Sequence, residues 1–267
     1  MRNNILVVIA IGLIMTFLLI SSCKREYSPV ASYNTPAGSA YLRIVHAAPS
    51  FGKIFNVPDS FNVLVGGAKV SAFLPGSNPY LSYGTIFPIS STLYGYITVP
   101  AGEQEIKLSS GVLNPDSVTI KKFTKVLVPN AYYSLIVTDS INSDKEAAQI
   151  FVRDTINKPT VGYFSLRFIH AVWNDTTGKS VDVWSARNNR YMATNIKPGS
   201  VTTFASYGYN AQLNDTLTVR RSGTGYTLAT FNNVAFGNQR TYTLYYKGDG
   251  NLTTGTRARG LATYVHQ

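Results

Sequence analysis

The sequence predicts an all-β protein in which two tandem immunoglobulin-like antiparallel β-sandwich domains follow a lipoprotein signal peptide. Three observations lead to this prediction: a sequence repeat, short runs of β-forming residues without a sustained helical period, and an apolar N-terminal segment that ends near a cysteine. The predicted segments are a signal peptide at 1–22, a lipidated cysteine and flexible tether at 23–39, a first sandwich at 40–158 and a second at 159–267.

The N-terminal segment has the features of a bacterial export signal. Arg2 precedes an aliphatic run over residues 5–20, which is shorter than the roughly 20 residues that a spanning helix needs. Ile20-Ser21-Ser22-Cys23 resembles the bacterial lipobox, so we expect acylation of Cys23, the one cysteine in the chain. The alternatives are an uncleaved anchor helix and a secreted protein with an unrelated cysteine.

An acylated Cys23 implies a lipid-anchored protein of the outer membrane, and the sequence leaves open whether it lies on the periplasmic or the surface-exposed face. Removal of residues 1–22 leaves 23 basic and 13 acidic side chains. This balance favours anionic neighbours such as lipid phosphates, lipopolysaccharide and acidic glycans, and we expect no nucleic acid partner for an exported protein. The basic residues are scattered in small groups, which also fits an ordinary solvated surface.

The repeat is anchored by two similar strands. Leu42–Ala47 reads LRIVHA and Leu166–Ala171 reads LRFIHA, with the histidines 124 residues apart. Pro-Gly-Ser at 75 and 198 and Ser-Tyr-Gly at 82 and 206 keep nearly this spacing, whereas Phe123 and Phe231 are 108 apart. The first copy therefore holds 16 more residues between Gly84 and Phe123, and we expect one added hairpin there.

Short runs rich in Val, Ile, Tyr, Thr and Phe recur in both copies, separated by Gly, Pro, Asn and Asp. We expect strands at Tyr41–Ala47, Phe61–Val65, Thr92–Val99, Glu103–Ser109, Val118–Val128 and Tyr132–Thr138, and in the second copy at Phe164–Ala171, Ser180–Ser185, Val201–Tyr207, Thr216–Arg221, Tyr226–Phe231 and Thr241–Tyr246. Strands of this length and spacing predict one antiparallel sandwich per copy.

The order of these landmarks resembles a family of duplicated extracytoplasmic domains of unknown function that is common in Bacteroidota lipoproteins. The resemblance covers Ser39 to Gly250 and rests on the anchor strands, Val181-Asp182-Val183-Trp184, Val99-Pro100-Ala101-Gly102 and Asn130-x-x-Tyr133-x-Leu135. It implies a sandwich fold and an envelope location, and it brings no catalytic residues. Asn62-Val63-Leu64 departs from the Asp-Val-aromatic pattern, so the resemblance supports no shared role for Asp182.

Each anchor strand carries a histidine and an arginine on opposite faces. His46 and His170 share a face with the larger apolar residues, and we expect buried imidazoles that donate to loop carbonyls rather than ligands or bases. Arg43 and Arg167 are expected to pair with local carboxylates or carbonyls, with an anion clamp as the alternative.

The chain lacks a phosphate-binding glycine loop, a zinc-spaced Cys/His set, an EF-hand and a Gly-x-Ser-x-Gly elbow. We therefore expect no enzyme, no catalytic residue, no cofactor and no metal. Glu103 and Glu105 alternate on one predicted strand, about 6.5–7 Å apart, and could pass for a glycosidase pair. A solvent-facing stripe on the same strand explains them equally well.

Asp followed by Ser or Thr recurs unusually often and resembles the O-glycosylation signal of Bacteroidota. The acceptor hydroxyls would be those of Ser117, Ser140, Thr155, Thr176 and Thr216, in exposed loops. The alternative is that these pairs only form turns that lead into strands, where they bond the local backbone.

Aromatic residues supply the candidate ligand site. Trp184, with Tyr191 and Arg187 nearby in sequence and Trp173 just after the second anchor strand, could form a platform for sugars or peptides, although tryptophan more often fills a core. The leading hypothesis is a non-enzymatic envelope lipoprotein that acts as a scaffold or adhesive module. The alternatives are a carbohydrate-binding lipoprotein associated with polysaccharide capture and, more distantly, an envelope glycoside hydrolase.

Overall fold

The computed structural model describes residues 38–55, 59–71, 81–88, 95–110, 119–139, 149–175, 180–211 and 214–266. Almost all regular structure in them is strand, with one short helix, α2 (Phe51–Phe55). The predicted signal peptide, Cys23 and nearly all of the tether lie outside these residues. Within the described ranges, no helix has the length and apolar character required to cross a membrane.

The strands up to Arg153, here called the first half, form two sheets. Sheet A has the order β10 (Ile150–Arg153), β9 (Tyr132–Val137), β1 (Ser39–His46) and β5 (Ile86–Phe87), with β6 (Ile97–Pro100) also paired to β1. Sheet B has the order β3 (Ala68–Lys69), β2 (Ser60–Val65), β7 (Gly102–Ser110) and β8 (Thr119–Leu127), with β4 (Leu81–Ser82) also paired to β2.

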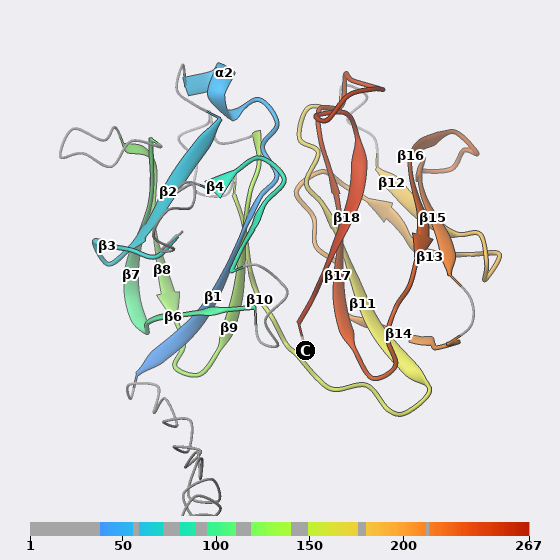
Figure 1. Ribbon diagram of the computed structural model, residues 1–267, viewed down its shortest axis with the longest axis horizontal. Coiled ribbons are helices and arrows are strands. Elements are labelled where there is room, and N and C mark those ends of the chain that lie inside the picture. The colour runs from blue at the N-terminus through green and yellow to red at the C-terminus, as the bar shows by residue number, and fades with distance from the viewer. Residues whose placement is uncertain are drawn as a thin grey trace, which may run out of the picture. The chain divides into compact units, whose positions relative to one another are not determined.

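The strands from Tyr163 onward, here called the second half, repeat this arrangement (Figure 1). Sheet C has the order β18 (Gly260–Val265), β17 (Thr241–Lys247), β11 (Tyr163–His170) and β14 (Ala205–Gly208). Sheet D has the order β13 (Arg190–Ile196), β12 (Val181–Ser185), β15 (Asp215–Arg221) and β16 (Thr227–Val234). The two anchor strands, β1 and β11, thus occupy equivalent places, as a duplicated unit requires.

One strand pair in each half departs from the predicted antiparallel pattern. β1 runs parallel to β9, and β11 runs parallel to β17, over six paired residues each. Parallel neighbours need a long crossover connection, and here the chain passes through the other sheet of the same half between the two strands. The prediction of purely antiparallel sandwiches is therefore wrong at the centre of sheets A and C.

Backbone hydrogen bonds also change the alignment of the two copies. Gly84 N donates to the His46 carbonyl at 2.9 Å, and Gly199 N donates to the His170 carbonyl at 2.8 Å. Gly84 is therefore equivalent to Gly199, not to Gly208 as the Ser-Tyr-Gly landmarks suggested. The segment from histidine to glycine is 38 residues long in the first half and 29 in the second, so the extra 16 residues lie on both sides of Gly84. The expectation of a single added hairpin after Gly84 is wrong.

The anchor strands bury both of their faces. Leu42 and Ile44 point into the core between sheets A and B, while Val45 and Ala47 point the other way. The outward residues lie in one apolar cluster with their equivalents Ile169 of β11 and Ala171, the residue directly after it. Sheets A and C therefore meet through their outer faces, which leaves the outer faces of sheets B and D free of this interface.

Two buried arginines cross this interface. Arg43, 1% exposed, donates from Nη1 to the Val265 carbonyl of β18 at 2.7 Å and from Nε to the Gly95 carbonyl at 2.6 Å. Arg167, 2% exposed, donates from Nη2 to Oδ1 of Asp154, directly after β10, at 2.5 Å. Each arginine thus reaches into the other half of the protein.

The ion pair between Arg167 and Asp154 lies inside a wider network. Oδ2 of Asp154 accepts hydrogen bonds from the Tyr96 and Ser134 hydroxyls, both at 2.7 Å, and Nε of Arg167 donates to Thr243 Oγ1 at 2.8 Å. Burial by itself would lower the pKa of the Arg167 guanidinium. The interactions with Tyr264 and Asp154 have the larger combined effect, so the pKa is raised. A buried charge held in this way depends on its partner.

Arg167→Met removes the cation and leaves the Asp154 carboxylate buried. We expect the free energy of unfolding to fall by about 3–5 kcal/mol, measured by urea denaturation. The double variant Arg167→Met/Asp154→Leu, which removes both charges, should recover most of this loss. Lys122→Ala is the control, because it breaks the exposed ion pair with Glu105 and should cost less than about 1 kcal/mol. A loss no larger than that of the control would contradict the role given to the buried pair.

Candidate functional site

The outer face of sheet D carries an aromatic pair. Val181 and Val183 of β12 point into the core and are 0% and 1% exposed, so the alternation of the strand turns Trp184 outward. Trp184 lies opposite Tyr191 of β13 and opposite Thr218 of β15. The pairing with β13 is irregular between Val183 and Trp184, and irregularities of this kind re-aim side chains near sites.

The guanidinium group of Arg220 lies against this aromatic pair. The Trp184 and Tyr191 ring centroids are 4.8 Å apart with an interplanar angle of 73°, and Cζ of Arg220 lies 4.6 Å from the Trp184 ring centroid. Nε of Arg220 donates to Oγ1 of Thr218 at 3.2 Å. Tyr191 is 43% exposed and Trp184 is half-buried. Trp184, Tyr191, Thr218 and Arg220 are called the sheet D platform below.

A shallow groove of about 630 Å³ adjoins the platform through Asp182, which shares the outward face of β12 with Trp184. Its lining is polar: Ser180, Asp182, Thr194, Asn195, Lys197, Ser222 and Gly223. Asp182 accepts hydrogen bonds from Asn195 N at 2.7 Å, Ser222 Oγ at 2.6 Å and Gly223 N at 3.2 Å. Its carboxylate therefore ties the end of β13 to the turn after β15, which together line the groove.

Two of the four residues predicted for the ligand site lie elsewhere. Arg187 donates its backbone N–H to Asp215 and lines a small pocket beside Phe164 and Phe236. Trp173 is 42% exposed and lies against the turn at Gly199, where an added Cβ would be 2.7 Å from the indole. Arg220 takes the place expected for Arg187, because sheet pairing brings β15 beside β12. The sequence alone did not reveal which strand pairs with β12 and therefore which arginine lies beside Trp184.

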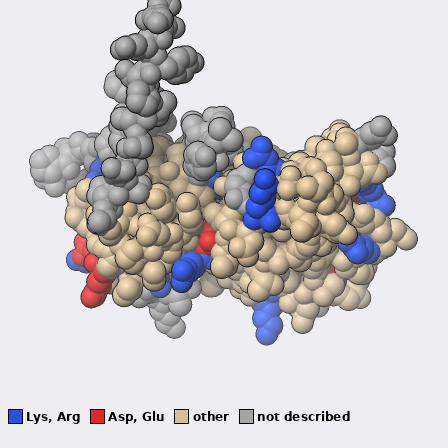
Figure 2. Space-filling view, turned by 90° about the horizontal axis from the view of Figure 1, so that it is seen from below, with Lys and Arg blue, Asp and Glu red and all other residues tan. Residues whose placement is uncertain are grey.

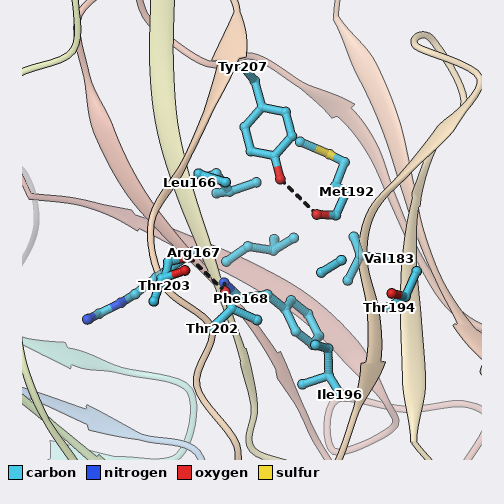
Figure 3. A pocket seen from close by; sticks show the side chains of 13 residues that line it. Leu166, Arg167, Phe168, Val183, Met192, Thr194, Ile196, Thr202, Thr203 and Tyr207 are labelled. Atoms are coloured by element: carbon cyan, nitrogen blue, oxygen red, sulfur yellow. Dashed lines mark hydrogen bonds between the residues drawn. The ribbon is translucent and has the colours of Figure 1, made fainter.

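A second candidate is the pocket between sheets C and D at the edges of β13 and β14 (Figure 3). Apolar core residues and three threonines line it, among them Leu166, Phe168, Met192, Thr194, Thr202 and Thr203. Its volume is about 260 Å³, and Tyr207 donates to the Met192 carbonyl across it at 2.8 Å. Ligand pockets usually measure about 300–1,000 Å³, so this space is too small for an oligosaccharide.

Both anchor-strand histidines are fully buried; His46 packs among aromatic rings, and His170 contacts the ring of Tyr246. Burial lowers the pKa of His46 to about 3 and that of His170 to about 4. The expected loop carbonyls are absent: within the described residues, Nδ1 of His46 accepts from Ala48 N at 3.3 Å, and neither ring nitrogen of His170 has a hydrogen-bond partner. The prediction of carbonyl-bonded imidazoles is wrong, and both rings contribute apolar packing instead.

The Asp-Ser/Thr motifs place most of their carboxylates inside the protein. Asp139, Asp154, Asp175 and Asp215 are all buried. Asp139 accepts from Ser50 N, and Asp215 accepts from Arg187 N and Ser185 Oγ, so these carboxylates hold backbone far away in sequence. Both the loop and the local-backbone interpretations missed this long-range role.

The predicted acceptor hydroxyls differ in their settings. Ser117, Ser140 and Thr176 lie outside the described residues. Thr155 is exposed in the segment after β10, as an acceptor must be. Thr216 is half-buried inside β15, which contradicts the expected exposed loop.

The two glutamates of β7 lie on the solvent-facing side of sheet B. Glu103 is exposed, and Glu105 forms an ion pair with Lys122 at 2.6 Å. Across the described part of the chain, no group of His, Cys, Asp and Glu side chains has the geometry to hold a metal ion.

Comparisons with known proteins give distant structural likenesses. No protein-family model matches the chain, and no curated protein sequence matches it. A Bacteroides thetaiotaomicron structure described as a putative polysaccharide binding protein (DUF1812) is 10% identical over 79% of this chain and 92% of its own, with a TM-score of 0.24.

Two further solved structures have about the same sequence identity and TM-score. A streptococcal virulence factor described by its α-glucan binding is 11% identical over 76% of this chain and 92% of its own, with a TM-score of 0.22. A putative cell adhesion protein from Bacteroides uniformis is 11% identical over 85% of this chain and 98% of its own, with a TM-score of 0.24. Likenesses this distant carry no argument about function, which therefore rests on the geometry of the site.

The burial of neutral His170 generates a pH prediction. The unfolded chain binds a proton at His170 below about pH 6.5, whereas the folded protein does so only below about pH 4. Stability should therefore fall as the pH drops through this window, by up to about 1.4 kcal/mol per pH unit from this residue. Urea denaturation between pH 4.5 and 7.5 should show a shallower slope for His170→Leu and an unchanged slope for Lys122→Ala. Equal slopes for His170→Leu and the unsubstituted protein would refute the buried neutral imidazole.

Proposed function

We propose that this chain is a non-enzymatic envelope lipoprotein, held at the outer membrane through acylated Cys23, and that it binds polysaccharide on the sheet D platform. The observation that carries the binding proposal is the solvent-facing pair of Trp184 and Tyr191 with Arg220 stacked on the indole. Sugar rings present faces of C–H groups that pack on aromatic rings, and their hydroxyls need hydrogen-bonding groups close by.

The surroundings of the platform support this proposal. The groove next to it offers amide, hydroxyl and ammonium groups from Asn195, Thr194 and Lys197. Strands β12 and β13 hold the aromatic rings, and a site on strands keeps its geometry better than one on loops. An open surface of this kind suits a long polymer, whereas the pocket of about 260 Å³ between sheets C and D is too small for one.

A scaffold or adhesive role is the second candidate. It is supported by the buried packing of sheets A and C, through which Arg43 and Arg167 tie the two halves together. We further propose that the halves are tandem immunoglobulin-like domains. The hydrolase alternative has little support, because the ion pair with Lys122 occupies one of its two glutamates.

The two tryptophans allow a direct test of the platform. Trp173→Phe leaves Trp184 as the only indole, and Trp184→Phe leaves Trp173. We expect titration with a polysaccharide that the protein binds to change the fluorescence of the Trp173→Phe protein and to leave that of the Trp184→Phe protein unchanged. The reverse pattern would place binding at Trp173 and reject the platform.

Trp184→Ala should weaken polysaccharide binding at least about 30-fold, the effect of losing a central aromatic anchor of about 2 kcal/mol. Tyr163→Ala is the matched control, because Tyr163 is a 47% exposed aromatic residue of sheet C. Affinity electrophoresis in polysaccharide gels measures both variants. Unchanged retention of Trp184→Ala would remove this surface as the site.

The anchor is tested separately in a Bacteroidota host. Cys23→Ser removes the only thiol that can be acylated, so the protein should move from the membrane fraction to the soluble fraction. Intact mass of the unsubstituted protein should exceed that of the chain from Cys23 onward by at least the mass of a diacylglyceryl group. A membrane-bound Cys23→Ser protein would contradict lipid anchoring.

A further inference from the structure

The positive charge of the protein is concentrated in one half of the chain. Residues 40–158 contain ten Lys and Arg against eight Asp and Glu, whereas residues 159–267 contain eleven Lys and Arg against four Asp and no Glu. The half that carries the sheet D platform therefore has a formal charge of +7, and the other half has +2. Such a surface attracts anions over a distance of about one Debye length.

The four aspartates of this half do little to offset the charge at the surface. Asp175, Asp182 and Asp215 are 5–6% exposed. Oδ1 of Asp249 accepts hydrogen bonds from Asn174 Nδ2 and Asn251 N, both at 2.8 Å. On the face drawn in Figure 2, basic side chains project from the right-hand part of the protein, where little acidic surface is visible.

Arg220 is the basic residue of the platform itself. It lies directly opposite Asp182 in the strand register, yet Asp182 bonds Asn195, Ser222 and Gly223, and the two side chains form no ion pair. Nε of Arg220 donates to Thr218, and within the described residues its terminal nitrogens donate to no partner. A guanidinium with a free edge is suited to bidentate binding of a carboxylate or sulfate.

Lys197 supplies a second cation on the same side. It is exposed, lines the groove beside Asp182 and Asn195, and forms no ion pair with any described residue. Asp182 is 6% exposed and its carboxylate accepts three hydrogen bonds from the protein, so Lys197 is the charged group that the groove presents to solvent.

We propose that the ligand of the sheet D platform is an acidic polysaccharide, one that carries uronic acid or sulfate groups. Its sugar rings stack on Trp184 and Tyr191, and its anionic groups bind Arg220 and Lys197. This inference rests on the proposed function and adds the charge of the ligand to it. A neutral chain would bury the free edge of Arg220 against hydroxyls alone, which form weaker hydrogen bonds than anions do.

The test uses two matched pairs of ligands: polygalacturonate with its methyl ester, and dextran sulfate with dextran. The full mature chain should bind at least one acidic member at least tenfold more tightly than its neutral counterpart in affinity electrophoresis. Arg220→Gln should weaken that binding at least tenfold, and Arg220→Lys, which keeps the charge but loses the planar fork, should weaken it less. Arg240→Gln makes the same charge change at an exposed arginine outside the platform and should have little effect.

Each other outcome overturns the inference. Equal binding of acidic and neutral members would reject it and leave the proposed function intact. Equal losses of affinity for Arg220→Gln and Arg240→Gln would mean that the net charge of the protein attracts the polymer non-specifically. The same conclusion would follow if the protein bound RNA or anionic vesicles as tightly as it binds the acidic polysaccharide. If the protein bound neither acidic polymer, the inference of an acidic ligand would also be rejected. If, in addition, no neutral polysaccharide changed the fluorescence of Trp184, the proposed function would fail as well.

Discussion

The arginines on the outward side of the anchor strands join the two halves. A guanidinium can leave water only where acceptors replace its hydration, and Arg43 and Arg167 find some of these in the opposite half. The duplication placed the same residue at both positions, but the partners differ. Arg167 meets a carboxylate and its pKa is raised, whereas Arg43 meets carbonyls and the rings of Tyr96 and Tyr264, and burial lowers its pKa. Each half therefore contributes one arginine to the other half, but the groups that these two arginines contact are different.

This interface decides which surfaces remain available. Sheets A and C bury their outer faces against each other, so sheets B and D keep theirs exposed to solvent. The two exposed sheets are not equivalent in chemistry. Sheet D presents Asp182 and Trp184 where sheet B presents Asn62 and Leu64, so the described strands of sheet B carry no equivalent of the platform tryptophan. The duplicated fold supplied two faces, and side-chain changes made one of them suitable for ligand.

Buried carboxylates have a second effect on that surface. Asp182 and Asp215 each accept hydrogen bonds from backbone and hydroxyl groups that lie 13 or more residues away, which closes the loops around sheet D. Both carboxylates are buried, so little of their negative charge lies at the protein surface. Because Asp182 bonds the backbone and Ser222, it forms no ion pair with Arg220, which lies opposite it on β15 and keeps a partly exposed guanidinium.

Local patterns in the sequence were enough for the strand content, the repeat and the placing of Trp184 on the strand face opposite Val181 and Val183, because alternation is encoded within a few residues. They did not decide whether that face lies in the core or in solvent. They did not reveal the parallel pairing of β1 with β9 or the equivalence of Gly84 and Gly199, since a shared tripeptide carries no information about register. The same limit hid the partner of Arg167 and the neighbour of Trp184. Arg187 is three residues from Trp184 and Arg220 is 36, yet cross-strand pairing selects Arg220. Which side chains meet was decided by the tertiary structure, because register is set by the burial and hydrogen bonding of strands far apart in the chain.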